Sequence, residues 1–158
     1  PAPSPAWVHA IPPAGARATA AATRGRLAEL DTWMATQIAA IPAGNRKLVT
    51  NHHVFGYFAK RYGFDVVGAV IPSGTTLASP SASDLKSLAD AIRRTKVKAI
   101  FADSSHPDRL AQVLASETRL DVRVVTLFSE SLSRREPGAA TYLDMMRTNT
   151  TAIVTSLQ

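Results

Sequence analysis

The sequence contains no cysteine, which excludes disulfide bonds, thiolate metal sites and cysteine nucleophiles. Any metal site must therefore be built from His, Asp or Glu side chains. Glycine is also sparse, at eight residues, and the glycines form neither the GxGxxG nor the GxxxxGK[ST] pattern that cradles nucleotide phosphates. We therefore expect no dinucleotide or nucleoside triphosphate cofactor.

Long hydrophobic runs are missing as well. The longest ones, such as residues 99–102 and 124–128, are far shorter than the roughly 18 residues that a membrane-spanning helix needs. We expect no transmembrane segment. The first six residues also lack the charged region and the apolar core of a signal peptide, so they do not indicate export by themselves.

The charge is basic but not concentrated. A net charge of +6 attracts nucleic-acid phosphates without sequence specificity. The lysines and arginines are scattered, however, and lack the interleaved aromatic residues of a single-strand binding groove, so we expect no nucleic-acid partner. With 46% hydrophobic and 19% charged residues among 158, the composition predicts one globular domain with a buried core.

The N-terminal part divides into two segments. Residues 1–13 are rich in proline, and we expect a disordered leader there. Apolar residues then recur at three- and four-residue spacing from Leu27 to Ile41, which predicts a long helix that is ended by Pro42 and fills residues 14–42. At about 1.5 Å per residue it would span roughly 40 Å. Since a domain of this size needs less, the helix is predicted to reach another part of the protein.

The remainder, residues 43–158, alternates short strand-like runs with helical patterns. Strands are predicted at 47–50, 66–71, 98–102 and 122–128, and helices at 55–62, 84–94, 107–116 and 139–157. Ser81 and Asp84 resemble a capping box. The alternation predicts an α/β fold, with a four-stranded parallel sheet flanked by helices and preceded by the long helix. Ligands of such sheets bind outside the carboxyl ends of the strands, which selects the loops at 52–53, 103–106 and 129–131.

Three histidines lie in these loops: His52, His53 and His106. Neutral imidazole together with a carboxylate suits zinc or manganese. The pattern alone does not show whether these histidines bind a metal. Adjacent histidines after a strand are commonly surface or capping residues, and no HExxH motif is present. In extended backbone His52 and His53 point in different directions. Only one of them can therefore face a shared site.

A hydrolase is an alternative reading, with Ser105 and His106 acting together with Asp103. Neighbours in sequence rarely form a catalytic triad, and a GxSxG elbow is absent. Pro107 suits the first position of a helix. The simpler prediction is that Ser105 or His106 is the N-cap of that helix.

The segment LVTNHHVFGYFAKRYG, residues 48–63, resembles a block of the zinc- and manganese-binding receptors of ABC importers. That block reads approximately T-S-[H/E]-x-A-F-x-Y-F-x-x-x-Y-G, and its histidine or glutamate is a metal ligand in the family. The matching residue is His52, whereas His53 falls at a variable position and is at best a spare ligand. Similar blocks follow in the same order at 80–88, 95–101, 127–132 and 142–146, so the resemblance covers most of residues 20–158.

The resemblance implies a metal site shared with a second lobe. The family fold has two α/β lobes joined by one long helix, with the metal in the cleft between them, and this chain resembles the C-terminal lobe with part of that helix. Glu130 stands where the family usually has an aspartate ligand, and its longer side chain shifts the carboxylate. His9 does not match the Asp-Pro-His motif of the N-terminal lobe. We therefore expect a half-site of His52 and Glu130, completed by a missing N-terminal lobe.

The function implied by the resemblance is binding, not catalysis. An extracytoplasmic receptor of this kind, in the periplasm or on the cell surface, captures zinc or manganese and delivers it to an ABC transporter permease. A lipid anchor on a missing N-terminus is compatible with this role. An adhesion or interaction protein with a vestigial metal site remains an alternative beside the hydrolase. Metal-dependent stabilisation and ester turnover distinguish the three.

Overall fold

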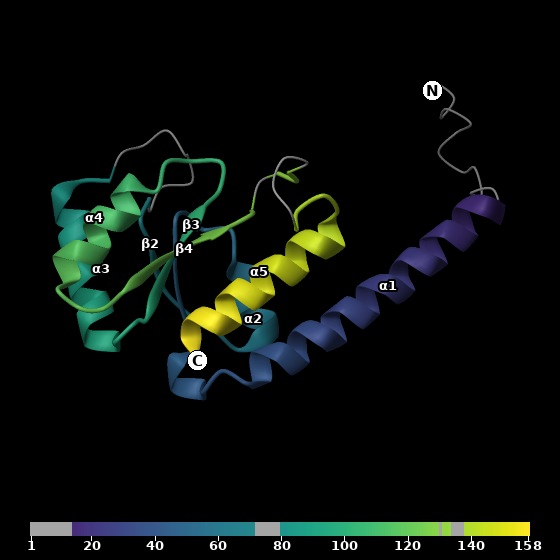
Figure 1. Cartoon of the computed structure of the whole chain (residues 1–158), viewed down its shortest axis with the longest axis horizontal. Helices are drawn as coiled ribbons and strands as arrows, with labels where there is room; N and C mark the ends of the chain where they lie inside the picture. Colours follow the sequence, from purple (N-terminus) through teal and green to yellow (C-terminus); the bar gives the residue numbers. More distant parts are fainter. Residues whose placement is uncertain (1–13, 72–79, 130, 134–137) are drawn as a thin grey trace, which may run out of the picture.

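The computed structural model describes residues 14–71, 80–129, 131–133 and 138–158 (Figure 1). The predicted leader, residues 1–13, therefore lies outside the described residues, and so does Glu130. A long helix projects from an α/β body, with its N-terminal end far from the sheet (Figure 1). None of the helices in the described ranges combines the length and hydropathy of a membrane span.

The sheet has four parallel strands in the order β2-β1-β3-β4, which confirms the predicted fold class. Its central strand β3 is buried along its whole length, as expected for a parallel sheet covered on both faces. The strands are β1 (Lys47–Thr50), β2 (Asp65–Ala69), β3 (Ala99–Asp103) and β4 (Arg123–Leu127).

Helices cover both faces of the sheet. The helices are α1 (Ala14–Ala39), α2 (Gly56–Tyr62), α3 (Ala82–Thr95), α4 (Arg109–Thr118) and α5 (Tyr142–Leu157), with a short 3-10 turn η2 at Ala43–Asn45. Helices α3 and α4 pack side by side on one face, whereas α5 packs on β4 and against α1 on the other (Figure 1). The order of elements makes each strand–helix–strand unit a crossover between parallel strands.

Successive strand residues alternate between two hydrophobic cores, because side chains of a strand point to opposite faces. Leu48 and Phe101 belong to the core beneath α1, α2 and α5. Val49 and Ile100 belong to the core beneath α3 and α4. The backbone of the sheet is thereby shielded from water on both sides, and only the strand ends and the loops at the sheet edges are available for binding.

Local sequence signals explain where α3 begins. The Ser81 hydroxyl accepts a hydrogen bond from the Asp84 amide at 3.1 Å, and the Asp84 carboxylate accepts one from the Ser81 amide at 3.1 Å. Both bonds satisfy amide groups that have no partner within the helix. The predicted capping box is therefore confirmed.

Helix α1 is amphipathic only in its second half. Leu30, Met34 and Ile38 are buried, but the side chains of residues 15–29 are exposed. Leu27, which the spacing placed on the apolar stripe, lines a hollow together with Leu30 and Met34 and retains 39% of its surface. Alanine has the highest helix propensity, which accounts for the helix where no other element covers it.

Candidate metal centre

The edge formed by the carboxyl ends of β1 and β3 is the topological switch point of the sheet. β1 continues to β2 on one side and β3 continues to β4 on the other, so the strand order reverses between these two neighbours. The connecting loops diverge at such a point and leave a crevice in which ligands of parallel sheets bind. The first residues after β1 and the last residue of β3 are therefore placed for function.

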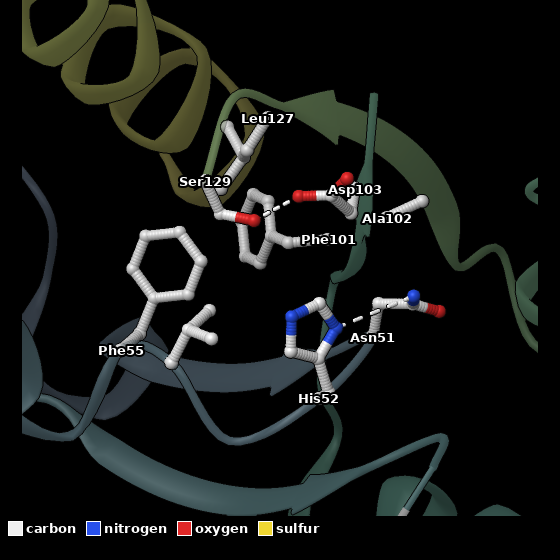
Figure 2. Close-up of a pocket in the computed structure, with 9 residues that line it drawn as sticks. Asn51, His52, Phe55, Phe101, Ala102, Asp103, Leu127 and Ser129 are labelled. Atoms are coloured by element: carbon white, nitrogen blue, oxygen red, sulfur yellow. Dashed lines mark hydrogen bonds between the residues drawn. The ribbon is translucent and has the colours of Figure 1, made fainter. Parts of the chain in front are cut away.

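A shallow, tightly packed hollow with no room for a water molecule lies at this edge (Figure 2). It brings together His52, Asp103 and Ser129, one residue from each of the three regions selected by the sheet-edge rule. The other lining residues are Asn51, Val54, Phe55, Phe101, Ala102 and Leu127. The wall is thus mostly apolar, with a few polar groups that converge from separate loops.

His52 is buried, with 7% of its surface exposed. The Thr50 hydroxyl donates to the His52 carbonyl at 3.0 Å, which fixes the backbone as it leaves β1. The His52 Nδ1 atom faces the Asn51 amide at 3.5 Å, and Nε2 points away from Asn51 on the side where Phe55 lies (Figure 2). Rotation of the Asn51 amide would let its oxygen accept Nδ1–H, and Nε2 is then the ring nitrogen that carries the lone pair. Because Nε2 is buried, an ion reaches it only with local movement of the side chains around it.

His53 lies on a different surface. Its side chain is exposed, and it borders a shallow depression formed by β2 and α3, together with Gly68 and Asp84. Of these two histidines, His52 lines the hollow together with Asp103, and His53 lies elsewhere.

Asp103 is the most buried charged group of the hollow, with 2% of its side chain exposed. Its Oδ1 atom accepts hydrogen bonds from the Ser105 amide at 2.7 Å and from the Ser105 hydroxyl. Its Oδ2 atom accepts a bond from the Ser129 hydroxyl (Figure 2). A buried carboxylate is tolerated only with such donors. Asp103 therefore links the loop after β3 to the loop after β4.

His106 completes this cluster. Its Nδ1 atom lies 2.8 Å from the Ser105 hydroxyl and 3.4 Å from Asp103 Oδ1. Its ring lies edge-on to that of His52, with 6.1 Å between centroids and 71° between planes. A catalytic triad needs the serine and the carboxylate on opposite nitrogens of the imidazole, but both face Nδ1 here.

The predicted capping role of Ser105 or His106 is wrong. Helix α4 begins at Arg109, and its N-cap position is Asp108. The Ser105 hydroxyl and His106 Nδ1 instead face the carboxylate of Asp103. The sequence around Pro107 suggested a helix cap. It could not show that Asp103, three residues before His106, is buried and accepts these hydrogen bonds.

Asn149 was not singled out from the sequence, yet it holds the end of β4. Its Oδ1 atom accepts from the Phe128 amide at 2.9 Å, and its Nδ2 atom donates to the Phe128 carbonyl at 2.6 Å. Asn149 is buried on α5 and fixes the backbone immediately before Ser129. An asparagine on the buried face of the closing helix was the only signal available.

The structure describes only one of the two predicted ligands. His52 lies in the hollow, whereas Glu130 is outside the described residues, next to Ser129 in the sequence. Within those residues, no group of three or more His, Asp or Glu side chains is arranged to hold a metal ion. The assignment of His52 and Glu130 as ligands stays a prediction.

Comparison with known proteins assigns the chain to a family. Residues 10–156 match the family of zinc-uptake complex component A, periplasmic, or ZnuA. The chain belongs to the ZnuA family. Zinc-binding protein TroA of Treponema pallidum is 34% identical over 136 residues, which cover 84% of this chain and 44% of TroA. Manganese-binding lipoprotein MntA of Bacillus subtilis is 30% identical over 133 residues, which cover 82% of this chain and 43% of MntA.

Solved structures agree with this assignment to the ZnuA family. The periplasmic zinc-binding protein TroA of Treponema pallidum superposes with a TM-score of 0.77 at 32% identity, over 86% of this chain and 50% of that one. A manganese-bound periplasmic metal-binding protein from Candidatus Liberibacter asiaticus gives 0.69 at 29% identity, over 90% and 50%. The chain therefore spans about half the length of the relatives that it matches, and the resemblance to zinc and manganese receptors is confirmed.

Proposed function

We propose that this chain is the C-terminal lobe of a receptor that captures a transition metal ion and delivers it to an ABC permease. The observation that carries the proposal is His52, a buried imidazole at the switch point of a sheet that matches TroA in fold. In this assignment residues 14–42 form the linker helix and residues 43–158 form the lobe.

The lobe contributes His52 and Glu130 to the metal. One nitrogen and one oxygen ligand suit zinc and manganese alike, and relatives with names of both kinds are similar to this chain. Two protein ligands leave coordination positions open, because zinc sites prefer four. The remaining ligands come from an N-terminal lobe, in keeping with a chain that spans about half of its relatives.

The receptor works outside the cytoplasm and carries out no reaction on the ion. The periplasmic and lipoprotein names of the relatives support this location, with a lipid anchor preceding the lobe as one means of attachment. Binding is favoured over hydrolysis because Ser105 and Asp103 face the same nitrogen of His106. In that arrangement Asp103 does not orient His106 from the opposite nitrogen as the general base for Ser105.

Calorimetric titration of Zn²⁺ and Mn²⁺ tests this function. The chain is expected to bind weakly, and a longer version that carries the N-terminal lobe is expected to bind far more tightly. His52→Ala should remove the binding, whereas His53→Ala is the matched control, because its exposed ring lies away from the hollow.

Three results would contradict the proposal. Tight binding by the chain alone that survives His52→Ala excludes the half-site. Equal weakness of the chain and the longer version favours a vestigial site in an adhesion or interaction protein. Turnover of a chromogenic ester that is lost in Ser105→Ala favours the hydrolase.

A further inference from the structure

We propose that Asp103 is the positioning residue of this half-site: it joins the loop after β3 to the loop after β4 and orients His106 against His52, without binding the metal itself. This inference rests on the proposed function, since it names what orients His52 and the loop that continues into Glu130. It is argued from the hydrogen bonds of one carboxylate and from the ring contact of one histidine.

The two oxygens of Asp103 serve different loops. Oδ1 accepts from the amide and the hydroxyl of Ser105, in the loop after β3. Oδ2 accepts from the hydroxyl of Ser129, which is 26 residues away in the loop after β4. The adjoining backbone is also paired, through the Ser104 amide and the Leu127 carbonyl at 2.9 Å, but that bond only extends the ladder of the sheet. The carboxylate is the side-chain link beyond the ladder.

These contacts separate Asp103 from a ligand. Both of its oxygens already accept hydrogen bonds from serine donors, and only 2% of the side chain is exposed. A charge-assisted hydrogen bond is roughly twice as strong as a neutral one. A metal at Oδ1 would have to displace one of its two serine bonds, whereas a carboxylate that keeps its bonds rigidifies both loops.

The same carboxylate reaches His52 indirectly. Asp103 Oδ1 and the Ser105 hydroxyl together face Nδ1 of His106, which sets the orientation of that ring. The His106 ring in turn lies edge-on to His52 at 6.1 Å. Groups that orient a metal ligand from behind commonly change metal affinity 10–100-fold when removed, so Asp103 links the His52 side of the hollow with the Ser129 side.

Two substitutions test the link. Asp103→Asn keeps the shape of the side chain but replaces one acceptor by a donor, and Ser129→Ala removes one donor and keeps the charge. Each is expected to weaken Zn²⁺ binding to the chain, followed by NMR titration, at least about tenfold. The double variant is expected to bind Zn²⁺ about as tightly as the single variant with the lower affinity. Both changes break the same contact between Ser129 and Asp103. Asp108→Asn and Ser131→Ala are the matched controls: both are exposed, in the same two loops.

A second measurement needs no metal. Amide hydrogen exchange of Ser105 and Ser129 should speed up about tenfold in Asp103→Asn, while exchange within β1 and α5 stays unchanged, because a local link is lost and the fold is kept. A variant that only lowers global stability would raise all of these rates together. If Asp103→Asn does not fold, the Zn²⁺ titration and the amide exchange are both measured on Ser129→Ala.

The outcomes separate the two proposals. Zn²⁺ affinity within about twofold of wild type in both single variants, or effects that add in the double variant, overturns the positioning role of Asp103. No Zn²⁺ response in the wild-type chain overturns the proposed function instead. In that case the exchange rates still decide whether Asp103 holds the two loops.

Discussion

Arg61 on α2 binds Asp31 on α1 through two hydrogen bonds, one from Nε to Oδ1 at 3.0 Å and one from its terminal nitrogen to Oδ2. The Tyr62 hydroxyl donates to the same Oδ1 at 2.8 Å. The three side chains join the long helix to the short helix that follows the His52 loop. The position of α1 relative to the hollow is therefore set in part by one carboxylate.

Tyr62 should ionise at a higher pH than an ordinary tyrosine. Burial, and then its hydrogen bond to Asp31, raises the pKa of Tyr62 to about 12. A pKa raised on folding contributes stability below about pH 10, and that contribution is lost as the pH rises towards about 12. Ultraviolet titration of wild type and Tyr62→Phe isolates this group. In Asp31→Asn we expect the Tyr62 pKa to fall but to stay raised, because burial remains. A Tyr62 pKa at the ordinary value of 10.0 would contradict the contact.

The same pair predicts a small effect at acid pH. Hydrogen bonds from Arg61 and then from Tyr62 lower the pKa of Asp31 below its ordinary value of 3.8. A lowered carboxyl pKa contributes stability above the unfolded value, and this is lost as the pH falls through the folded value. Because Arg61 is exposed to solvent, which screens the charges, we expect only a small loss of stability. Urea unfolding of wild type and Asp31→Asn at pH 7 and pH 3 measures it, with exposed Asp121→Asn as the control. A larger loss at pH 7 than at pH 3 supports the contact, and equal losses contradict it.

Asn149→Ala should destabilise the chain by about 2–4 kcal/mol, because it leaves the amide and the carbonyl of Phe128 buried without their partners. Asn149→Asp keeps the acceptor for the amide but loses the donor to the carbonyl, so we expect an intermediate effect. Thr151→Ala, exposed on the same helix, is the control and should change the free energy of unfolding by less than about 0.5 kcal/mol. Chemical denaturation gives all three values. An Asn149→Ala effect as small as that of the control would refute the role.

Gly63→Ala should cost about 1 kcal/mol through backbone conformation alone. Gly63 ends α2 with φ at +72°, and an added Cβ would lie 4.0 Å from its nearest neighbour, Arg46. Crowding is therefore not the cause. Gly56→Ala, at the start of the same helix with nothing within 4 Å, is the matched control and should be neutral or slightly stabilising. Equal effects at both positions in thermal unfolding would argue against a left-handed cap.

Periodicity and turn chemistry were sufficient for the elements of the fold. The alternation of strands and helices predicted the sheet, and Ser81 with Asp84 predicted the start of α3, because both signals lie within a few residues of each other in the chain. The apolar stripe of α1 was right, although Leu27 at its start is only partly covered. Spacing shows which face of a helix is apolar, but not which elements are present to cover it.

The site was harder to predict, for a physical reason. The sheet-edge rule selected loops that converge on one hollow, but the family resemblance was needed to prefer His52 over His53 as the predicted ligand. The roles of Asp103 and Asn149 depend on partners 26 and 21 residues away. Single residues of these types are common in any sequence, and only the fold brings Asp103 to Ser129 and Asn149 to Phe128.

Helix α1 is held near its middle by the contact between Asp31 and Arg61. From Leu30 to Ala14 the helix continues for 16 residues with no buried side chain among residues 15–29, a length of about 24 Å at about 1.5 Å per residue. A tilt of about 10° at this contact moves the first turn by about 4 Å. A small shift of α2, which follows the His52 loop, would therefore produce a larger displacement at the N-terminal end of α1.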